Sequence, residues 1–241
     1  MVHNELIEKR GIIKEIRQIG ISLYTYLVDI GEESFPPLCY AIRLGIVGKT
    51  LTRPYSPVSF TGSTVECIIK IYPQEEGKNM FTPDLEKLSV GDELRVLWYT
   101  PKYPIEEILS TKHMHVCMIS AGTGITPMMQ ILDYAAQNRS MHKFTSIALS
   151  HSANHQILKD SSLYSGISLE CISLMSKHPD CTHAELIRKI EVLIQPLLSK
   201  DVLYLVCGPD SFVEAVSGVR KGEYGGLLMR HNVPSSSCYK F

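Results

Sequence analysis

A change in the spacing of the apolar residues near residue 108 constrains the fold of this chain more than any other feature. Over residues 10–98 the apolar side chains recur with a period closer to two than to 3.6, which indicates strands. Strands are predicted over residues 12–17, 23–29, 38–44, 65–72 and 93–98. Dense glycine and proline turn signals between them are typical of an antiparallel barrel or sandwich. One helix is expected among the strands, starting at Pro83 with Thr82 as its N-cap.

Beyond residue 108 apolar strands alternate with amphipathic helices. Strands are predicted at 115–120, 145–150, 168–175 and 202–207, and helices at 127–138, 183–193 and 209–219. Such alternation predicts a mostly parallel, doubly wound sheet that takes ligands at the carboxyl ends of its strands. The expected fold is therefore two-domain, with an antiparallel β-barrel over residues 1–108 followed by a doubly wound α/β domain over residues 109–241.

Charge and composition argue against several classes of protein. The 24 basic and 25 acidic side chains give a net charge of -1, so no global field attracts nucleic acid or anionic lipid. No apolar run approaches the roughly 18 residues that span a bilayer, and a cytoplasmic protein without a transmembrane segment is expected. The seven cysteines form no Cys-x-x-Cys pair, and His151 and His155 have no glutamate between them, so no metal site is expected.

The segment 121–127, Ala-Gly-Thr-Gly-Ile-Thr-Pro, stands directly between a predicted strand and an amphipathic helix. Gly122 and Gly124 allow a sharp turn and a close approach, and Thr126 is expected to cap a helix that starts at Pro127. Such a turn offers free N–H groups and a partial positive charge to an anion such as a dinucleotide diphosphate. The alternative is a tight connection without a ligand, since Pro127 occupies the last glycine position of the Gly-x-Gly-x-x-Gly fingerprint.

A second turn, Cys207-Gly208-Pro209, ends the last predicted sheet strand and opens the last helix. Turns of this kind in one sheet would face the same crevice. Cys207 is either a small buried group or a neighbour of a nicotinamide ring.

The segment 53–59, Arg-Pro-Tyr-Ser-Pro-Val-Ser, should be extended, because its prolines disfavour helix. Alternation then sends Arg53 and Tyr55 to the same side. A cofactor with a phosphate and a flat ring would use Arg53 for the phosphate, Tyr55 for the ring and Ser56 for ring atoms. The alternative is an edge strand with a surface arginine.

Together these motifs resemble the ferredoxin–NADP⁺ reductase superfamily, and within it the NADH–cytochrome b5 reductase family. Segment 53–57 looks like the family's flavin motif, and segment 69–72, Ile-Lys-Ile-Tyr, like its following strand. The run 77–92 resembles its phosphate-binding loop and helix through Gly77-Lys78, Met80 and Thr82. Segments 122–127 and 207–209 resemble its pyridine-nucleotide motifs.

The resemblance implies roles for individual residues. Arg53 would hold an FAD phosphate, Tyr55 and Ser56 would contact the isoalloxazine, and Cys207 would flank the nicotinamide. Ser56, Thr123 and Cys207 are the residues implied nearest to the chemistry. The implied cofactor-binding residues are Arg53, Pro54, Tyr55, Ser56, Ile69, Lys70, Tyr72, Gly77, Lys78, Met80, Thr82, Gly122, Thr123, Gly124, Thr126, Pro127, Cys207, Gly208 and Pro209.

The activity that the resemblance implies is hydride transfer from NADH to FAD, followed by single-electron transfer to a haem acceptor such as cytochrome b5, by a monomer. The loop 77–82 is longer than the family's usual form and segment 98–103 replaces its Gly-Pro-x-Gly, so FMN stays open. Lys177 and His178 could equally accept the 2′-phosphate of NADPH. The open alternatives are another redox partner, such as an iron–sulfur protein or an oxygenase, and a non-catalytic flavin-binding module. Phe241 would pack near the flavin edge or act as a hydrophobic plug.

Overall fold

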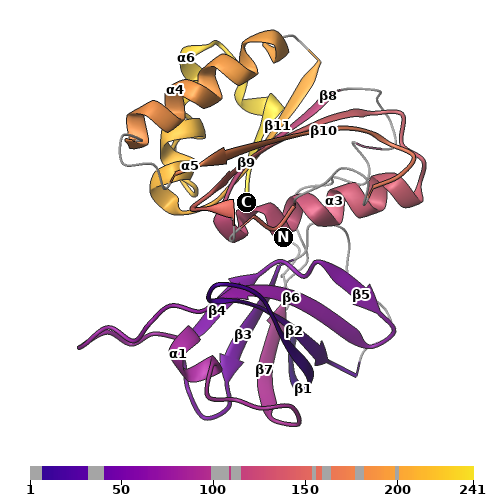
Figure 1. Cartoon of the computed structure of the whole chain (residues 1–241), viewed down its shortest axis with the longest axis vertical. Coiled ribbons are helices and arrows are strands. Elements are labelled where there is room, and N and C mark those ends of the chain that lie inside the picture. The colour runs from indigo at the N-terminus through magenta and orange to yellow at the C-terminus, as the bar shows by residue number, and fades with distance from the viewer. Residues whose placement is uncertain are drawn as a thin grey trace, which may run out of the picture. The chain divides into compact units, whose positions relative to one another are not determined.

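The chain folds into two compact units, Met1–Glu106 and Glu107–Phe241, in a computed structural model (Figure 1). The structure describes residues 7–31, 41–98, 109, 115–153, 156–158, 164–176, 182–198 and 201–241. Each unit has its own sheet and its own hydrophobic core. The predicted boundary at residue 108 lies outside the described residues.

The first unit is a seven-stranded antiparallel sheet in the order β4-β3-β7-β1-β2-β6-β5. β4 also approaches β6, so the sheet curls back on itself as a half-barrel (Figure 1). Its strands are β1 (Ile7–Gly20), β2 (Leu23–Asp29), β3 (Ile42–Ile46), β4 (Thr52–Tyr55), β5 (Ser59–Thr61), β6 (Thr64–Lys70) and β7 (Glu93–Trp98). β1 pairs with β7 along residues 7–12 and with β2 along residues 12–20, and the second pairing contains two register shifts.

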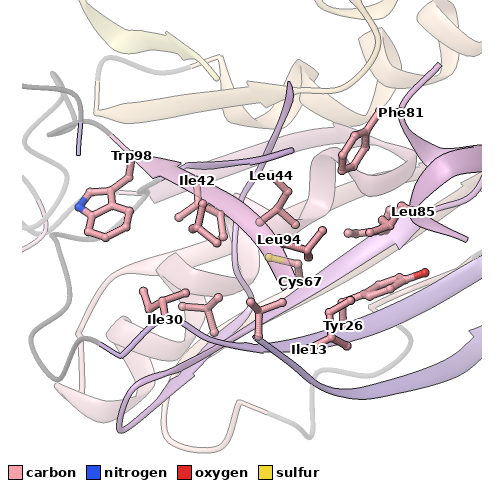
Figure 2. Packing of buried hydrophobic residues seen from close by; sticks show 14 of the residues in the cluster. Ile13, Tyr26, Ile30, Ile42, Leu44, Cys67, Phe81, Leu85, Leu94 and Trp98 are labelled. Carbon is pink, nitrogen blue, oxygen red and sulfur yellow. The ribbon is translucent and has the colours of Figure 1, made fainter. Parts of the chain in front are cut away.

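Alternate side chains of these strands gather in one buried core (Figure 2). Ile13, Leu44 and Leu94 are fully buried within it. The short helix α1 (Thr82–Leu85) and the residue before it close this core, because Leu85 and Phe81 insert their side chains (Figure 2). Burying side chains of this size contributes about 1.5–3 kcal/mol each, so the core fixes where the neighbouring loops begin and end.

The prediction that Thr82 caps α1 is wrong. The N-cap residue is Phe81, which has helical backbone angles and makes no capping bond through its side chain. The hydroxyl of Thr82 instead accepts a hydrogen bond of 3.1 Å from the backbone N–H of Tyr72. The reason is that Thr82 is buried, and an N–H group beside it needs an acceptor when water is excluded.

The second unit is a five-stranded parallel sheet in the order β10-β9-β8-β11-β12. Its strands are β8 (His115–Ala121), β9 (Lys143–Ser150), β10 (Ser168–Met175), β11 (Val202–Cys207) and β12 (Cys238–Lys240). Its helical segments are η1 (Gly122–Ile125), α3 (Thr126–Gln137), α4 (His183–Ile194), η4 (Gln195–Leu197), α5 (Asp210–Ser217), α6 (Gly226–Arg230) and η5 (Ser235–Ser237). Helix α3 covers one face of this sheet, and α4, α5 and α6 cover the other (Figure 1).

The predicted fold class is confirmed, since a curled antiparallel sheet precedes a parallel α/β sheet. The prediction missed β5, β12 and α6, all of which are five residues long or shorter. Edge strand β4 lies where the segment from Arg53 was expected to be extended. Residues 38–40 of one predicted strand lie outside the described residues. In the described part of the chain, no helix combines the length and the apolar character needed to cross a membrane.

Asp133 is a half-buried carboxyl on α3, and its burial raises its pKa from the usual 3.8 to about 6. Because the pKa is higher in the folded chain, the protonated form is the one that folding favours. The stabilisation is fully present below pH 3.8 and is lost as the pH rises through about 6. A shift of this size corresponds to about 3 kcal/mol, which partial solvent screening lowers to about 1–2 kcal/mol.

Asp133→Asn is therefore expected to raise the free energy of unfolding by about 1–2 kcal/mol at pH 7.5 relative to the original chain, with little difference near pH 4. Urea unfolding of both chains between pH 4 and pH 8 measures this. Glu214→Gln, which changes an exposed carboxyl on α5, is the matched control and should show no such pH-dependent gain. An equal effect of Asp133→Asn at both pH values would contradict the prediction.

Candidate functional site

The edge strand β4 presents Arg53 and Pro54 to solvent. A proline suits this edge, because the missing N–H removes no hydrogen bond from the interior of a sheet. The Arg53 guanidinium donates one hydrogen bond of 3.3 Å to the backbone oxygen of Thr52 and has no acidic partner among the described residues. Most of its forked donors are therefore available to an external phosphate or carboxylate.

Tyr55 follows on the same strand as a half-buried ring. Its ring centroid lies 6.0 Å from that of Phe81, and the two planes are tilted by 42°. Burial raises the pKa of the Tyr55 phenol well above its usual value, so the group stays protonated at neutral pH. A firmly anchored aromatic ring with a hydroxyl donor can pack against a flat ligand and also hydrogen-bond to it. Ser56, next in the chain, is half-buried as well.

Three further predicted residues lie at or just after the end of β6. The Lys70 ammonium lies 5.3 Å from the centroid of the Tyr72 ring, a cation–π distance, and Tyr72 is half exposed. Ile69 is fully buried in the core, so only its backbone can reach a ligand. This strand end therefore offers one cation and one aromatic face.

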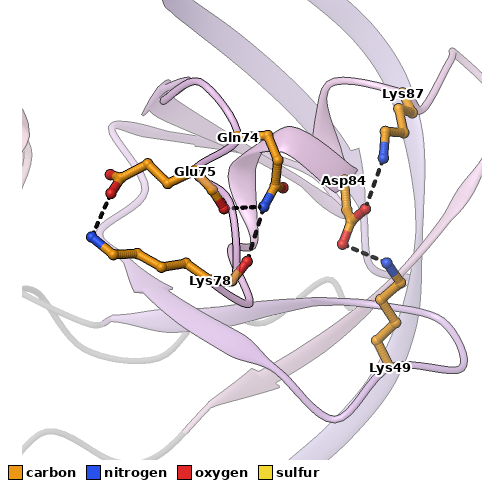
Figure 3. A network of polar contacts seen from close by, with 6 residues as sticks. All are labelled: Lys49, Gln74, Glu75, Lys78, Asp84 and Lys87. Atoms are coloured by element: carbon orange, nitrogen blue, oxygen red, sulfur yellow. Dashed lines mark hydrogen bonds and ion pairs between the residues drawn. The ribbon is translucent and has the colours of Figure 1, made fainter.

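The predicted phosphate loop after β6 is held by its own polar contacts (Figure 3). Gly77 has a φ of +73°, a conformation that favours glycine. The side-chain amide of Gln74 donates to the backbone oxygens of Glu75 and Lys78, both at 2.9 Å, and the Lys78 ammonium pairs with the Glu75 carboxylate. An exposed pair of this kind contributes about 0–1 kcal/mol, so Lys78 could exchange Glu75 for a phosphate at little cost.

Asp84 fixes the helix that follows this loop (Figure 3). Its carboxylate accepts hydrogen bonds from the ammonium groups of Lys49 and Lys87, and these contacts hold the pKa of Asp84 below its usual value. Both lysine charges are thereby committed to the start of α1. Of the predicted loop residues, Met80 is half-buried and Thr82 is buried.

In the second unit, the turn after β8 is a 3₁₀ helix that runs directly into α3. Gly122 has a φ of +57°, and helical structure starts there. The prediction that Thr126 caps the helix is wrong, because the cap residue is Ile125 and the Thr126 hydroxyl donates at 2.9 Å to the backbone oxygen of Thr123. The first N–H groups of a helical segment have no partner within it, so the open donors lie at Gly122 and Thr123.

The structure brings the turn after β8 and the turn after β11 into direct contact. A Cβ atom placed on Gly124 would lie 2.5 Å from the Cys207 backbone oxygen and 2.7 Å from the Gly208 nitrogen. A Cβ atom on Gly208 would lie 2.8 Å from the Phe212 ring and 3.0 Å from the Ala121 Cβ. Close approach of the Cys207–Gly208 backbone therefore requires a glycine at position 124, and the Phe212 ring and the Ala121 side chain leave little room for a Cβ atom at position 208.

Cys207 is half-buried at the centre of this contact. Burial raises the pKa of its thiol to about 11, although the nearby Arg220 guanidinium opposes the shift. The group is therefore a neutral thiol at pH 7, which suits packing against a flat ring and not nucleophilic attack. Thr123 is half-buried, Pro127 is buried and Pro209 is exposed.

Phe241 lies beside the turn after β11. Phe241 packs its ring edge-on against that of Tyr239, with centroids 4.8 Å apart, and its N–H donates to Val206 at 3.0 Å. Lys177, His178, His155 and residues 99–103 lie outside the described part of the chain. Within that part, no cluster of three or more histidine, cysteine or acidic side chains could hold a metal ion.

Sequence reasoning missed Arg220, which holds the backbone of the second turn at Gly208, and Lys240, which holds the loop that carries Arg220. No local signal could have found them, because Arg220 contacts residues 12 and 21 positions away along the chain.

Comparison with known proteins places these observations in a family context. Residues 118–218 match the oxidoreductase NAD-binding domain family. NADH-cytochrome b5 reductase 2 of Aspergillus clavatus is 28% identical over 221 residues, which covers 80% of this chain and 63% of that protein. The NADH-cytochrome b5 reductase-like protein of Arabidopsis thaliana is 27% identical over 220 residues, covering 80% and 62%. The chain thus spans less than two thirds of the length of these relatives.

Solved structures show the same fold. The CS-b5R domains of human Ncb5or in the NAD⁺ form match 99% of this chain and 70% of that chain with a TM-score of 0.74 at 21% identity. Ferredoxin-NADP⁺ reductase of Plasmodium falciparum matches 97% and 95% with a TM-score of 0.70 at 14% identity. The chain is thus similar in sequence to NADH–cytochrome b5 reductases and shares the two-unit fold of these solved structures.

Proposed function

We propose that the chain is a flavin-dependent NAD(P)H oxidoreductase that passes a hydride from NADH to FAD and then single electrons to a haem acceptor such as cytochrome b5. The observation that carries the proposal is the contact between the turns after β8 and β11, where Gly124 admits the Cys207–Gly208 backbone. The names of the relatives support the choice of donor and acceptor.

The position of that contact in the sheet is the first argument for nucleotide binding. From β8 the chain proceeds through β9 to β10 on one side, and β11 is added on the other side of β8. The topological switch point therefore lies between β8 and β11, at the carboxyl ends of the strands, where doubly wound sheets take their ligands. The turns at Gly122 and Gly208 follow these two strands, and open N–H donors of the first turn suit a diphosphate.

The first unit offers the complementary chemistry for a flavin. Arg53 has donors to spare for a phosphate, and Tyr55 is a ring anchored by the core. Bound FAD would supply the exchange between a two-electron donor and one-electron acceptors. The protein's own residues would bind and orient, and no histidine or glutamate is needed to move a proton. We infer that Ser56, Thr123 and Cys207 lie nearest to the reacting rings.

The finer choices in the proposal rest on resemblance. NADH is preferred to NADPH and FAD to FMN for that reason, and the same holds for a monomer in the cytoplasm. The loop 77–82, longer than the family's usual form, and the altered segment 98–103 keep FMN, which lacks the diphosphate, as an alternative. The test therefore measures flavin binding and nucleotide oxidation separately.

The full chain should take up flavin and bleach on addition of nicotinamide nucleotide under anaerobic conditions. Purified protein is incubated with FAD or FMN, freed of excess flavin, and mixed with NADH or NADPH while the flavin absorbance is followed; ferricyanide reduction then measures turnover. A chain that retains neither flavin would sink the proposal. Flavin uptake without bleaching by either nucleotide would identify a binding module instead of an enzyme.

Arg53→Ala is expected to raise the dissociation constant for FAD about tenfold to hundredfold, because a charge-assisted hydrogen bond to a phosphate contributes about 1.5–3 kcal/mol. Fluorescence titration of the flavin measures this. Arg10→Ala is the matched control, since Arg10 is an exposed arginine of the same sheet that pairs with Glu93. Equal FAD affinity in the two variants would remove Arg53 from the site.

Gly124→Ala is expected to weaken NADH binding at least tenfold and to lower the free energy of unfolding by about 1–3 kcal/mol, because the new methyl group must push the two turns apart. Calorimetric titration and urea unfolding measure the two effects. Gly225→Ala is the control, because its φ of -171° is open to any residue and the nearest atom to a new Cβ is 3.6 Å away. Normal NADH affinity in Gly124→Ala would contradict the proposal that the two turns together bind the nucleotide.

A further inference from the structure

Arg220 joins three separate segments of the second unit. It lies on the loop between α5 and α6, and its side chain is 30% exposed. Its guanidinium donates to the backbone oxygen of Gly208, to the backbone oxygen of Phe241 and, at 2.9 Å, to the carboxylate of Asp210. The first of these contacts reaches the turn that lies against Gly124.

The loop that carries Arg220 is itself firmly fixed. Gly218 has a φ of +86°, and a Cβ atom there would lie 2.4 Å from the Glu223 backbone oxygen. The Lys240 ammonium donates to the backbone oxygens of Val219 at 2.6 Å and of Gly222 and Glu223 at 3.4 Å. Arg220 therefore reaches the turn from a rigid base, and β12 and this loop hold each other through two cations.

The chemistry of these contacts distinguishes an arginine from a lysine. A planar guanidinium can donate from different nitrogens to two backbone oxygens at once, and in this chain Nη1 and Nη2 do so. A lysine ammonium carries all its donors on one nitrogen, so it cannot present two separated donors in the fixed planar fork of a guanidinium. The pair with Asp210 is of less weight, because the Asp210 side chain is 89% exposed and such surface pairs contribute little.

We propose that Arg220 is a positioning residue for the nicotinamide nucleotide. Its guanidinium holds the Cys207–Gly208 turn against Gly124, so that the nucleotide meets a preformed surface. This inference rests on the proposed function. The turn is fixed on one side by close approach at Gly124 and on the other by the guanidinium at the Gly208 oxygen. A preformed surface lowers the ordering that binding would otherwise require.

The test compares Arg220→Gln and Arg220→Lys with two controls in the full chain loaded with flavin. Arg230→Gln changes an exposed arginine of α6, and Asp210→Asn removes only the surface pair. NAD⁺ binding is measured by calorimetry, flavin affinity by fluorescence, and the amide signals of Gly124 and Gly208 by NMR without nucleotide. Both Arg220 variants are expected to bind NAD⁺ about tenfold more weakly, to shift both amide signals and to keep flavin affinity unchanged.

The outcomes separate this inference from the function on which it rests. If the original chain binds NAD⁺ and both Arg220 variants bind it equally well, the positioning role is wrong and the proposed function stands. Parallel loss of flavin affinity would show a general structural role instead and would also overturn the inference. If Arg220→Gln does not fold, the NAD⁺ affinity of Arg220→Lys tests the inference, because this variant keeps the positive charge and loses the planar guanidinium. If the original chain binds neither NAD⁺ nor NADP⁺, the proposed function fails as well.

Discussion

The contact between Gly124 and the Cys207–Gly208 backbone is the constraint on which the second unit depends. β8 and β11 are parallel neighbours, with Ser120 opposite Cys207, so the two strands end at the same level of the sheet. Their turns can meet there only if the first one has no side chain at the point of approach. The absence of a Cβ atom thus converts two ordinary strand ends into one continuous backbone surface.

Most of the architecture could be predicted from the sequence because its signals are local. Hydrophobic periods and turn residues lie within a few positions of one another, and they indicated the antiparallel first unit, the alternating second unit and both glycine turns. The N-caps were wrong for a physical reason. A threonine before a proline satisfies the local capping rule, but the Thr82 hydroxyl accepts from Tyr72 and the Thr126 hydroxyl donates to Thr123. Which bond forms is decided by packing.

The sequence predicted which residue types form the candidate site, but it did not predict which of their side chains can reach a ligand. In segment 69–72 side chains alternate between the two faces of the strand, so Lys70 and Tyr72 lie on the face opposite the buried Ile69. The motif nevertheless assigned all three residues to the cofactor site. Lys78 has the charge that a phosphate needs, and in the folded loop that charge is paired with Glu75. Such pairings depend on the conformation of the whole loop, which no single position encodes.

Three arginines show why residue type alone does not separate a ligand-binding side chain from a supporting one. Arg43 donates to the hydroxyl and the backbone oxygen of Thr52, and Arg220 donates to the backbone oxygens of Gly208 and Phe241. Both guanidinium groups are occupied by the protein itself. Among the described residues, Arg53 makes one bond, to its own strand, and its other guanidinium donors have no partner there. The distinction is the number of donors that folding leaves unsatisfied, so an arginine contributes to recognition only where the fold supplies fewer oxygens than the side chain can bind.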